Sequence, residues 1–346
     1  MKKIVLTGGG TGGHVIPALA LVDTLKENDY KIYYIGSKNG IERELAKNLP
    51  YYPISTGKLR RYLDFKNITD MVRVIKGITE AISALGNIKP DIVFSKGGFV
   101  SVPVVIGAWL LKIPIIVHES DISFGLANKI GAHFAAHICV AFPELNGKNT
   151  TLTGTPIRKE LFNGSKEIGL AYTSFTRNLP VLLVMGGSSG SVSINKTIKE
   201  SLPLLLPNFN IIHICGKNNA SNLKAEGYIQ YEYINKQLAN IFALCDVVIS
   251  RSGANALQEF LALKKPNLLI PLPKNISRGD QIQNAQSYKK MGYSIVLEEH
   301  ELTPEILLKK IIYLYENKNT YIENMEKNTL KDTIKEIVCI IKKYSK

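Results

Sequence analysis

Short apolar runs rich in β-branched residues alternate along this chain with longer stretches in which apolar residues recur every three or four positions. The short runs are typical of strands buried on both faces, and the longer pattern is typical of amphipathic helices. Their regular alternation predicts parallel sheets in an α/β protein. The predicted strands are Lys3–Leu6, Lys31–Ile35, Asp91–Phe94, Ile115–His118 and His137–Ala141, then Val181–Val184, Ile211–Ile214, Asp246–Ile249, Leu268–Ile270 and Ser294–Leu297.

Helices are predicted between these strands. They begin near Gly13, Gly40, Asn67, Ser101 and Phe124, and again near Ser191, Leu238, Asn255 and Asp280. The stretch Thr151–Arg158, which contains Gly154 and Pro156, is predicted to be a linker. We therefore expect two Rossmann-like domains that face each other across a cleft, residues 1–155 and 156–329. A Lys-rich helix at about 330–346 could pack back on the first domain.

An internal similarity supports this division. Residues 90–98, Pro-Asp-Ile-Val-Phe-Ser-Lys-Gly-Gly, resemble residues 245–253, Cys-Asp-Val-Val-Ile-Ser-Arg-Ser-Gly. The glycine-rich stretch Gly8–His14 likewise corresponds to Gly186–Ser191 in the second half. In doubly wound folds, ligands bind outside the carboxyl ends of the strands, so we expect ligand sites at these turns.

Four predicted strands run directly into turns of small residues that begin helices: Gly8–His14, Ser95–Gly98, Gly186–Ser191 and Ser250–Asn255. Glycine lets the backbone approach a ligand closely, and the N–H groups at a helix start favour bound anions. One such turn is often no more than a tight connection. Four of them, two in each half, favour the binding of diphosphate groups.

The type of diphosphate ligand can be narrowed. Gly8, Gly10 and Gly13 formally satisfy the dinucleotide-binding pattern, but the second strand ends in Ile35-Gly36-Ser37-Lys38 and lacks the carboxylate that holds a ribose. NAD is therefore disfavoured. The chain contains neither a P-loop motif nor an Asp-x-Asp pair. We expect no metal and no other cofactor, with helix starts and basic side chains binding the diphosphate.

Several side chains near these turns suit sugar chemistry. Glu259, one to two turns into a predicted helix, could accept hydrogen bonds from ribose hydroxyls, although an exposed surface position is the alternative. Asp280 and Gln281 could bind sugar hydroxyls, while Asp280 could instead cap a helix. His14 is a candidate general base at the first glycine turn, since histidine titrates near neutral pH.

Charge and composition leave other function classes open. Lys and Arg number 43 against 29 Asp and Glu, a net charge of +14 that favours nucleic acid, phosphorylated metabolites or an acidic membrane face. A basic, non-enzymatic nucleic-acid or membrane-surface binding protein is thus an alternative, and an NAD oxidoreductase is a weaker one. The four cysteines lack metal-ligand spacing. Prolines and Lys112 interrupt the apolar run Phe99–Val117, so we expect a cytoplasmic protein without a membrane span.

The motifs together resemble the MurG-type N-acetylglucosaminyltransferases of cell-wall synthesis over nearly the whole chain. The resemblance rests on segments in the family's order: residues 9–14, 96–101, 118–121, 154–158, 185–188 and 250–253. It implies the GT-B architecture and an inverting transfer of GlcNAc from UDP-GlcNAc to the 4-hydroxyl of undecaprenyl-pyrophosphoryl-MurNAc-pentapeptide. A GT-B membrane-lipid glucosyltransferase and a UDP-GlcNAc 2-epimerase are close alternatives.

The resemblance also implies roles for individual residues. The donor would bind mainly the second domain, and the acceptor pyrophosphate would lie over the Thr11–Gly13 and Gly97–Gly98 turns of the first. His14 is the implied base, with Glu119 as second choice. Asp121 and Asp280 depart from the residues usual in the family, so Gln281 is preferred to Asp280. The implied donor contacts are Thr11, Gly12, Gly13, Arg158, Ser188, Ile234, Ser252, Gly253, Ala254, Glu259 and Gln281, and the implied acceptor contacts are Gly97, Gly98 and Asp121.

An acceptor whose lipid tail stays in the membrane implies an enzyme that docks on the cytoplasmic membrane face as a peripheral protein. Leu63 and Phe65 in a basic segment, and Trp109 at the end of a predicted helix, would anchor it to anionic lipid. For Leu110 and Leu111 we expect core packing instead. Other cell-wall synthesis proteins are further candidate partners, and nucleic acid is not expected to be one.

Overall fold

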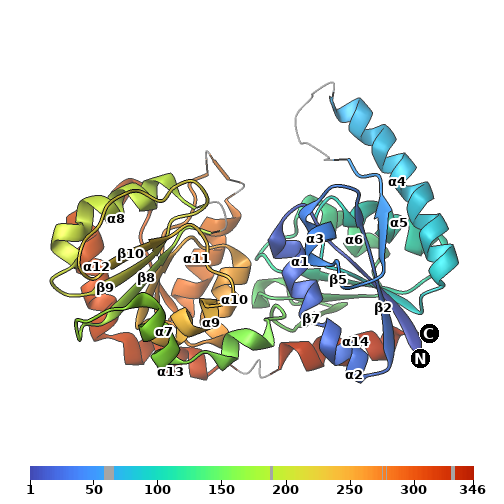
Figure 1. Ribbon diagram of the computed structural model, residues 1–346. Coiled ribbons are helices and arrows are strands. Elements are labelled where there is room, and N and C mark those ends of the chain that lie inside the picture. The colour runs from blue at the N-terminus through green and yellow to red at the C-terminus, as the bar shows by residue number, and fades with distance from the viewer. Residues whose placement is uncertain (58–65, 188–189, 275, 278, 329–331) are drawn as a thin grey trace. The chain divides into compact units, whose positions relative to one another are not determined.

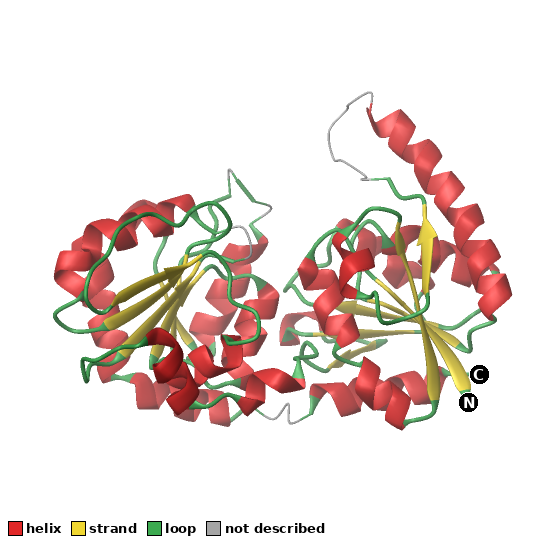
Figure 2. Ribbon diagram, in the orientation of Figure 1, coloured by secondary structure: helices red, strands yellow, loops and turns green. Residues whose placement is uncertain are grey.

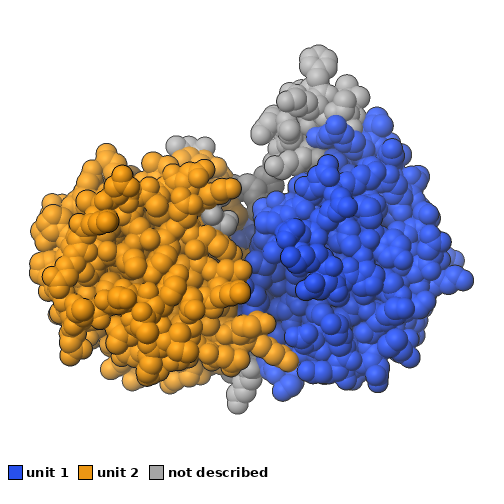
Figure 3. Space-filling view, in the orientation of Figure 1, with its two compact units in different colours: residues 1–158, 330–346 blue, residues 159–329 orange. Residues whose placement is uncertain are grey.

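The chain forms two compact units, which are coloured separately in Figure 3. The computed structural model describes residues 1–57, 66–187, 190–274, 276–277, 279–328 and 332–346, and of residues 66–69 only the backbone. Unit 1 consists of residues 1–158 and 330–346, and unit 2 of residues 159–329. The chain thus leaves unit 1 after Arg158 and returns to it for its last helix.

The described strands of unit 1 form one sheet in the order β3-β2-β1-β4-β5-β6-β7. Each pair of neighbours in this sheet is parallel. The strands are β1 (Lys2–Thr7), β2 (Tyr30–Ser37), β3 (Tyr51–Ile54), β4 (Ile92–Ser95), β5 (Ile115–Glu119), β6 (His137–Val140) and β7 (Thr150–Leu152).

Helices cover both faces of this sheet, as Figure 2 shows. They are α1 (Gly12–Leu19), α2 (Val22–Glu27), α3 (Ile41–Leu45), α4 (Lys66–Ile88), α5 (Ser101–Leu110), α6 (Leu126–Phe134) and α14 (Thr333–Tyr344), with a 3-10 turn, η1 (Pro143–Leu145). Alternate residues of β1 point to opposite faces: Ile4 and Leu6 pack in the core with α14, and Val5 packs in the core with α4 and α5. This double burial explains why the strand is apolar at successive positions.

The return of the chain to unit 1 is built into the core. Ile334, Ile337, Val338 and Ile341, one face of α14, are buried against β1 and its neighbours. The two termini lie side by side in Figure 1. A hydrogen bond joins them, since the Nζ of Lys2 donates to the carbonyl of Ser345 at 3.2 Å. Because its apolar face is buried in unit 1, α14 is a structural part of that unit.

Unit 2 repeats the same plan with described strands in the order β10-β9-β8-β11-β12-β13, again parallel throughout. The strands are β8 (Val181–Met185), β9 (Asn210–Ile214), β10 (Tyr228–Tyr231), β11 (Val247–Ser250), β12 (Asn267–Leu269) and β13 (Ser294–Val296). The helices are α7 (Lys166–Thr173), α8 (Val192–Leu205), α9 (Leu238–Leu244), α10 (Ala254–Ala262), α11 (Asp280–Lys290), α12 (Pro304–Glu316) and α13 (Lys318–Glu326), with 3-10 turns η2 (Lys159–Asn163) and η3 (Glu299–Glu301).

The prediction of two parallel α/β domains is confirmed, and every predicted strand is present within a residue or two of its predicted bounds. The strands that the sequence pattern missed, β3, β7 and β10, all lie at sheet edges. Edge strands are short and partly exposed, so they lack a continuous apolar run. The predicted linker Thr151–Arg158 was wrong in its first residues, since Thr151 and Leu152 belong to β7.

Candidate functional site

Both sheets reverse their strand order at one place, and the glycine turns follow the strands on either side of it. In unit 1 the reversal lies between β1 and β4, which lead into Gly8–His14 and Lys96–Gly98. In unit 2 it lies between β8 and β11, which lead into Gly186–Ser191 and Arg251–Ala254. Helices after such neighbouring strands leave toward opposite faces, which opens a crevice at the carboxyl edge of the sheet.

The first turn of unit 1 divides into a packed part and an open part. Gly10 has a φ of +84°, and a Cβ there would lie 2.5 Å from the ring of Phe99. A Cβ at Gly9 would lie 2.7 Å from the carboxyl carbon of the buried Glu42. At Gly12 the nearest atom to a Cβ would be 3.6 Å away. The earlier glycines thus serve backbone packing, and room for a ligand begins at Gly12.

His14 lies where the two turns of unit 1 meet. Its Nδ1 is 3.0 Å from the Oγ1 of Thr11, and a Cβ added to Gly98 would lie 3.1 Å from the same ring nitrogen. Gly97 and Gly98 both have positive φ, +93° and +80°, which favours glycine. The structure therefore brings together the predicted base and both predicted acceptor turns.

The carboxylate of Glu119 is buried and already accepts three hydrogen bonds. Its Oε1 accepts from the backbone N–H of Asp121 at 3.0 Å, and its Oε2 accepts from the N–H of Gly125 and from Nδ2 of Asn128, both at 3.0 Å. These contacts fix the loop between β5 and α6. They hold the carboxylate of Glu119 against the backbone of the half-buried Asp121.

A buried cation behind the Gly97–Gly98 turn was not singled out from the sequence. Lys96 is 1% exposed, and its Nζ donates to the Oγ of Ser120. Burial lowers the pKa of Lys96 to about 8, against the opposing effect of Glu119 and Asp121. The neighbouring His118 donates from Nε2 to the carbonyl of Gly154 at 2.8 Å, and burial holds its pKa well below the usual value.

Unit 2 contains a cavity of about 650 Å³ at its reversal point. Both glycine turns line it, together with Ser250 at the end of β11 and Leu272 in the segment after β12. A Cβ on Gly187 or Gly253 would meet nothing within 4 Å, so the backbone there is open to a ligand. Ser188, a predicted diphosphate contact, lies outside the described residues. The lining residues are Gly186, Gly187, Gly190, Ser191, Val192, Ser193, Lys196, Ser250, Arg251, Gly253, Ala256, Leu272, Ile276, Gln281 and Glu299.

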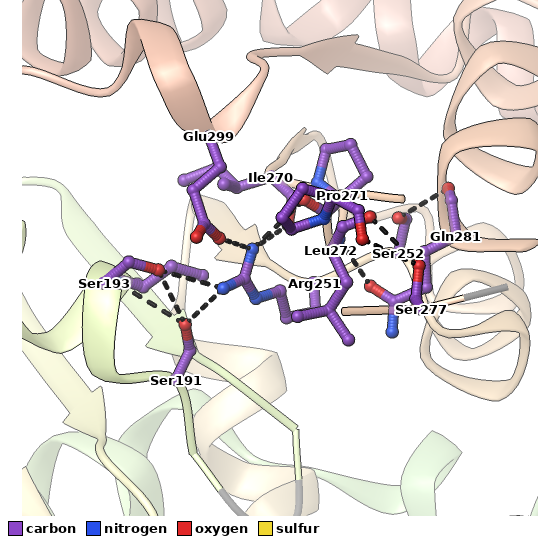
Figure 4. A network of polar contacts seen from close by, with 12 residues as sticks. Ser191, Ser193, Arg251, Ser252, Ile270, Pro271, Leu272, Ser277, Gln281 and Glu299 are labelled. Carbon is purple, nitrogen blue, oxygen red and sulfur yellow. Dashed lines mark hydrogen bonds and ion pairs between the residues drawn. The ribbon is translucent and has the colours of Figure 1, made fainter. Parts of the chain in front are cut away.

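Arg251 joins several segments that border this cavity, as Figure 4 shows. It is 7% exposed and forms an ion pair with Glu299. Its Nη2 donates to the hydroxyls of Ser191 and Ser193 at 2.7 and 2.9 Å. Its Nη1 donates to the carbonyls of Ile270 and Pro271 at 3.0 and 3.2 Å. One planar guanidinium thereby fixes the start of α8, the end of β12 and η3 relative to one another.

The predicted sugar and diphosphate contacts of unit 2 lie close to this network. The Oε1 of Gln281 accepts from the backbone N–H of Leu272 at 3.1 Å, which orients its amide at the cavity wall. The hydroxyl of the buried Ser252 donates to the carbonyl of Gln281 at 2.8 Å. Since that hydroxyl is already engaged, the turn offers a ligand its backbone more readily than this side chain.

The remaining predicted donor residues are spread over both units. Ala254 is the buried first residue of α10, and Glu259 is half-buried on the same helix. Ile234 is buried in unit 2. Arg158 belongs to unit 1, and its Nε is buried without a hydrogen-bond partner among the described residues. In the part of the chain that the structure describes, His, Cys, Asp and Glu side chains form no group that could hold a metal ion.

The predicted membrane contacts have mixed outcomes. Leu63 and Phe65 lie outside the described residues, and Trp109 is 50% exposed and packs on Phe134 with ring centroids 4.9 Å apart. The expectation of core packing for Leu110 and Leu111 was wrong, because they are 51% and 38% exposed at the end of α5.

A second exposed apolar surface was missed from the sequence. Met71, Val72 and Ile75 are each more than half exposed on α4, beside the exposed Arg73 and Lys76. We call these five residues the α4 patch. The first turns of α4 stand out from the rest of unit 1 in Figure 1. Among the described residues no helix is both long and apolar enough to cross a membrane.

Comparison with known proteins identifies the family. Residues 4–140 match the glycosyltransferase family 28 N-terminal domain, and residues 181–337 match the glycosyltransferase family 28 C-terminal domain. Together these matches span most of the chain, which therefore belongs to glycosyltransferase family 28.

Two full-length relatives carry the same name, UDP-N-acetylglucosamine--N-acetylmuramyl-(pentapeptide) pyrophosphoryl-undecaprenol N-acetylglucosamine transferase. The one from Clostridium botulinum (strain Langeland) is 54% identical, with 100% of both chains covered. The one from Clostridium kluyveri is 52% identical, covering 99% of this chain and 100% of the relative.

Solved structures support the fold. MurG of Acinetobacter baumannii superimposes with a TM-score of 0.77 at 24% identity, covering 99% of this chain and 100% of that chain. The calicheamicin glycosyltransferase CalG4 superimposes with a TM-score of 0.73 at 14% identity, covering 99% and 98%. The predicted GT-B architecture, two Rossmann-like halves, is thus confirmed.

The Arg251 network generates a stability prediction. Arg251→Met leaves the carboxylate of Glu299 at the cavity wall without its partner, and losing one member of a largely buried pair costs about 3 kcal/mol. We expect the free energy of unfolding of unit 2 to fall by that order in denaturant titrations followed by far-ultraviolet circular dichroism, which reports on both units. Arg251→Met/Glu299→Met should recover part of the loss.

Trp109, the only tryptophan in the chain, lies in unit 1. Its fluorescence therefore reports the unfolding of unit 1. The midpoint measured by this signal should not move in the variant, so it provides the internal control. A single variant as stable as the wild type, or a double variant less stable than the single one, would contradict the ascribed role of Arg251.

Proposed function

We propose that this protein transfers GlcNAc from UDP-GlcNAc to the 4-hydroxyl of undecaprenyl-pyrophosphoryl-MurNAc-pentapeptide, with inversion at the anomeric carbon. The observation that carries this proposal is 54% identity, over the whole chain, to a relative named for this transfer. The geometry supports it as well, because both substrates contain a pyrophosphate and each unit has paired glycine turns at a strand-order reversal. The lipid glucosyltransferase, epimerase, oxidoreductase and nucleic-acid alternatives gain no such support.

The donor binds mainly unit 2. Its diphosphate lies over the open backbone of Gly187 and of the Ser252–Ala254 turn, with Ser188 contributing from the same loop. Gln281, whose amide is oriented by Leu272, binds the GlcNAc hydroxyls. Glu259 accepts hydrogen bonds from the ribose, and Arg158 and the backbone at Ile234 contact the uracil.

The acceptor binds unit 1. Its pyrophosphate lies over the Thr11–Gly13 turn, which also meets the donor, and over the Gly97–Gly98 turn. The open space at Gly12 and the N–H groups at the start of α1 support this placement, because an anion gains both hydrogen bonds and the favourable helix dipole there. Asp121, positioned by Glu119, contacts the muramoyl-peptide part of the acceptor.

His14 is the general base of the proposed mechanism. In the productive tautomer Nδ1–H donates to the Oγ1 of Thr11, which places the ring lone pair on Nε2. Nε2 takes the proton of the muramoyl 4-hydroxyl while that oxygen attacks the anomeric carbon from the face opposite UDP. The bond to UDP breaks, and the N–H groups of the unit 2 turns stabilise the charge that develops on the departing diphosphate.

The proposal is tested by measuring UDP release from UDP-GlcNAc with the lipid-linked muramoyl pentapeptide as acceptor. We expect release that depends on the acceptor and a β-1,4-linked disaccharide product. A folded protein that binds both substrates and transfers nothing would refute the proposed function.

Replacing His14 tests the base. A positioned general base contributes typically about 10²–10⁴-fold to rate, so His14→Ala should lower turnover by that order. The affinity for UDP-GlcNAc, measured by calorimetry, should change less than about twofold. Thr11→Val, which removes the partner of Nδ1 and keeps the imidazole, should fall between the wild type and His14→Ala. A His14→Ala rate equal to that of the wild type would eliminate His14 as the base.

Replacing Glu259 tests the ribose contact. Hydrogen bonds to a charged group contribute about 1–3 kcal/mol, and Glu259→Ala should weaken UDP binding by that amount. The matched control is a UDP analogue that lacks the ribose hydroxyls, which should bind wild type and variant equally. Equal affinities of the two proteins for UDP itself would show that the ribose lies elsewhere.

We also propose that unit 1 docks on the cytoplasmic face of the cell membrane through the α4 patch and Trp109. Apolar side chains beside basic ones are suited to insertion between anionic lipid headgroups. The Ile75→Asp variant places a charge in the patch, and we expect at least a tenfold loss of binding to phosphatidylglycerol vesicles. Ser83→Asp, an exposed position on the same helix about two turns beyond the patch, is the matched control. Equal loss in both variants would indicate a non-specific charge effect and contradict the patch.

A further inference from the structure

The same position in each unit holds a buried cation. Lys96 is the first residue after β4 and Arg251 is the first residue after β11, the corresponding strands beside the two reversal points. Their exposed fractions are 1% and 7%. Each is followed by a turn that contains glycine, Gly97–Gly98 or Ser252–Gly253, and each lies close to carboxylate side chains.

Lys96 is joined to the loops of unit 1 from which the acceptor site would be built. Its Nζ donates to Ser120, and the hydroxyl of Thr155 donates to the same Ser120 oxygen at 3.3 Å. Its backbone leads directly into Gly97, where a Cβ would lie 2.6 Å from the amide of Asn128. A movement of Lys96 would therefore be transmitted both to the Gly97–Gly98 turn and to the loop that carries Asp121.

The charge of Lys96 matters because of the groups around it. Glu119 and Asp121 are the two sequence neighbours of Ser120, to which Lys96 donates, and both carboxylates favour the protonated form of Lys96. Without a cation, the negative charge of these two carboxylates would be uncompensated beside the turn, which disfavours a bound pyrophosphate. A buried positive charge acts strongly there, because protein screens less than water.

Packing alone does not require a lysine at this position. Burying an ammonium group costs free energy that an apolar side chain of similar length would not cost. Arg251 shows the corresponding arrangement in unit 2, where a buried cation balances Glu299 and fixes the turn over which the donor diphosphate is proposed to lie.

We propose that Lys96 is a positioning residue that makes the Gly97–Gly98 turn able to receive the pyrophosphate of the lipid-linked acceptor, by balancing Glu119 and Asp121 and by holding Ser120. This inference rests on the proposed function and adds to it a determinant of acceptor binding that touches neither substrate.

The test compares Lys96→Met with the wild type in steady-state transfer assays. We expect the KM for the acceptor to rise at least tenfold, while the KM for UDP-GlcNAc and kcat at saturating acceptor stay within about twofold. A purely structural defect would lower kcat and the folded fraction together.

A pH series supplies a second readout. As pH rises from 7 to 9, Lys96 loses its proton near its pKa of about 8, so the wild-type acceptor KM should rise over that range. The neighbouring His118 stays neutral, because burial and the charge of Lys96 keep its pKa well below the usual value. Cys139 also stays neutral, since burial raises its pKa to about 12. Glu119 and Asp121 supply the facing negative charges. The Lys96→Met variant should show no such rise.

The outcomes separate this inference from the function on which it rests. If the wild type transfers GlcNAc and Lys96→Met has the same acceptor KM and the same pH dependence, the role of Lys96 is refuted and the function stands. If the folded wild type transfers no GlcNAc, the proposed function itself fails.

Discussion

The parallel direction of the strands within each sheet is the constraint on which the rest of the structure depends. Since neighbouring strands run the same way, every connection that follows a strand emerges at the same edge of its sheet. At one point in each sheet the strand order reverses, and there two turns lie together without a helix between them. In both units these are the glycine turns. The strand order therefore brings together the backbone amides and helix starts that the proposed anion sites require.

A buried cation occupies the same position beside the glycine turns of both units. Arg251 and Lys96 occupy corresponding positions, and each is hydrogen-bonded to a serine on a neighbouring segment. The two cations differ in the contacts that they make. The planar guanidinium of Arg251 joins several segments, whereas the ammonium group of Lys96 donates to Ser120 and balances the charge of two nearby carboxylates. The cation is thus part of the turn in both halves.

Much of this organisation is predictable from the sequence. Doubly buried strands such as β1 are apolar at successive positions, Ile4 to Leu6, so their pattern is strong, and the glycine turns follow them directly. The edge strand β7, with the polar Thr150 and Thr151, carries no such signal, and the predicted linker included its last two residues.

The similarity of Ser95-Lys96-Gly97-Gly98 to Ser250-Arg251-Ser252-Gly253 is visible in the sequence, but the burial of the two basic residues is not. Basic residues are usually exposed, and only tertiary contacts reveal exceptions. The same limit explains Leu110 and Leu111, which are apolar yet exposed.

Binding of pyrophosphate by backbone amides is the central claim, and amide NMR on protein labelled with ¹⁵N-glycine tests it most directly. UDP-GlcNAc, titrated in the presence of a metal chelator, should perturb the amide signals of Gly187 and Gly253 at the open turns of unit 2. Glycines of unit 2 that precede strands, such as Gly227 before β10 and Gly292 before β13, lie away from the carboxyl edge of the sheet and should remain unchanged. Saturable donor binding that leaves the Gly187 and Gly253 signals unperturbed, or that disappears when divalent ions are chelated, would contradict the account.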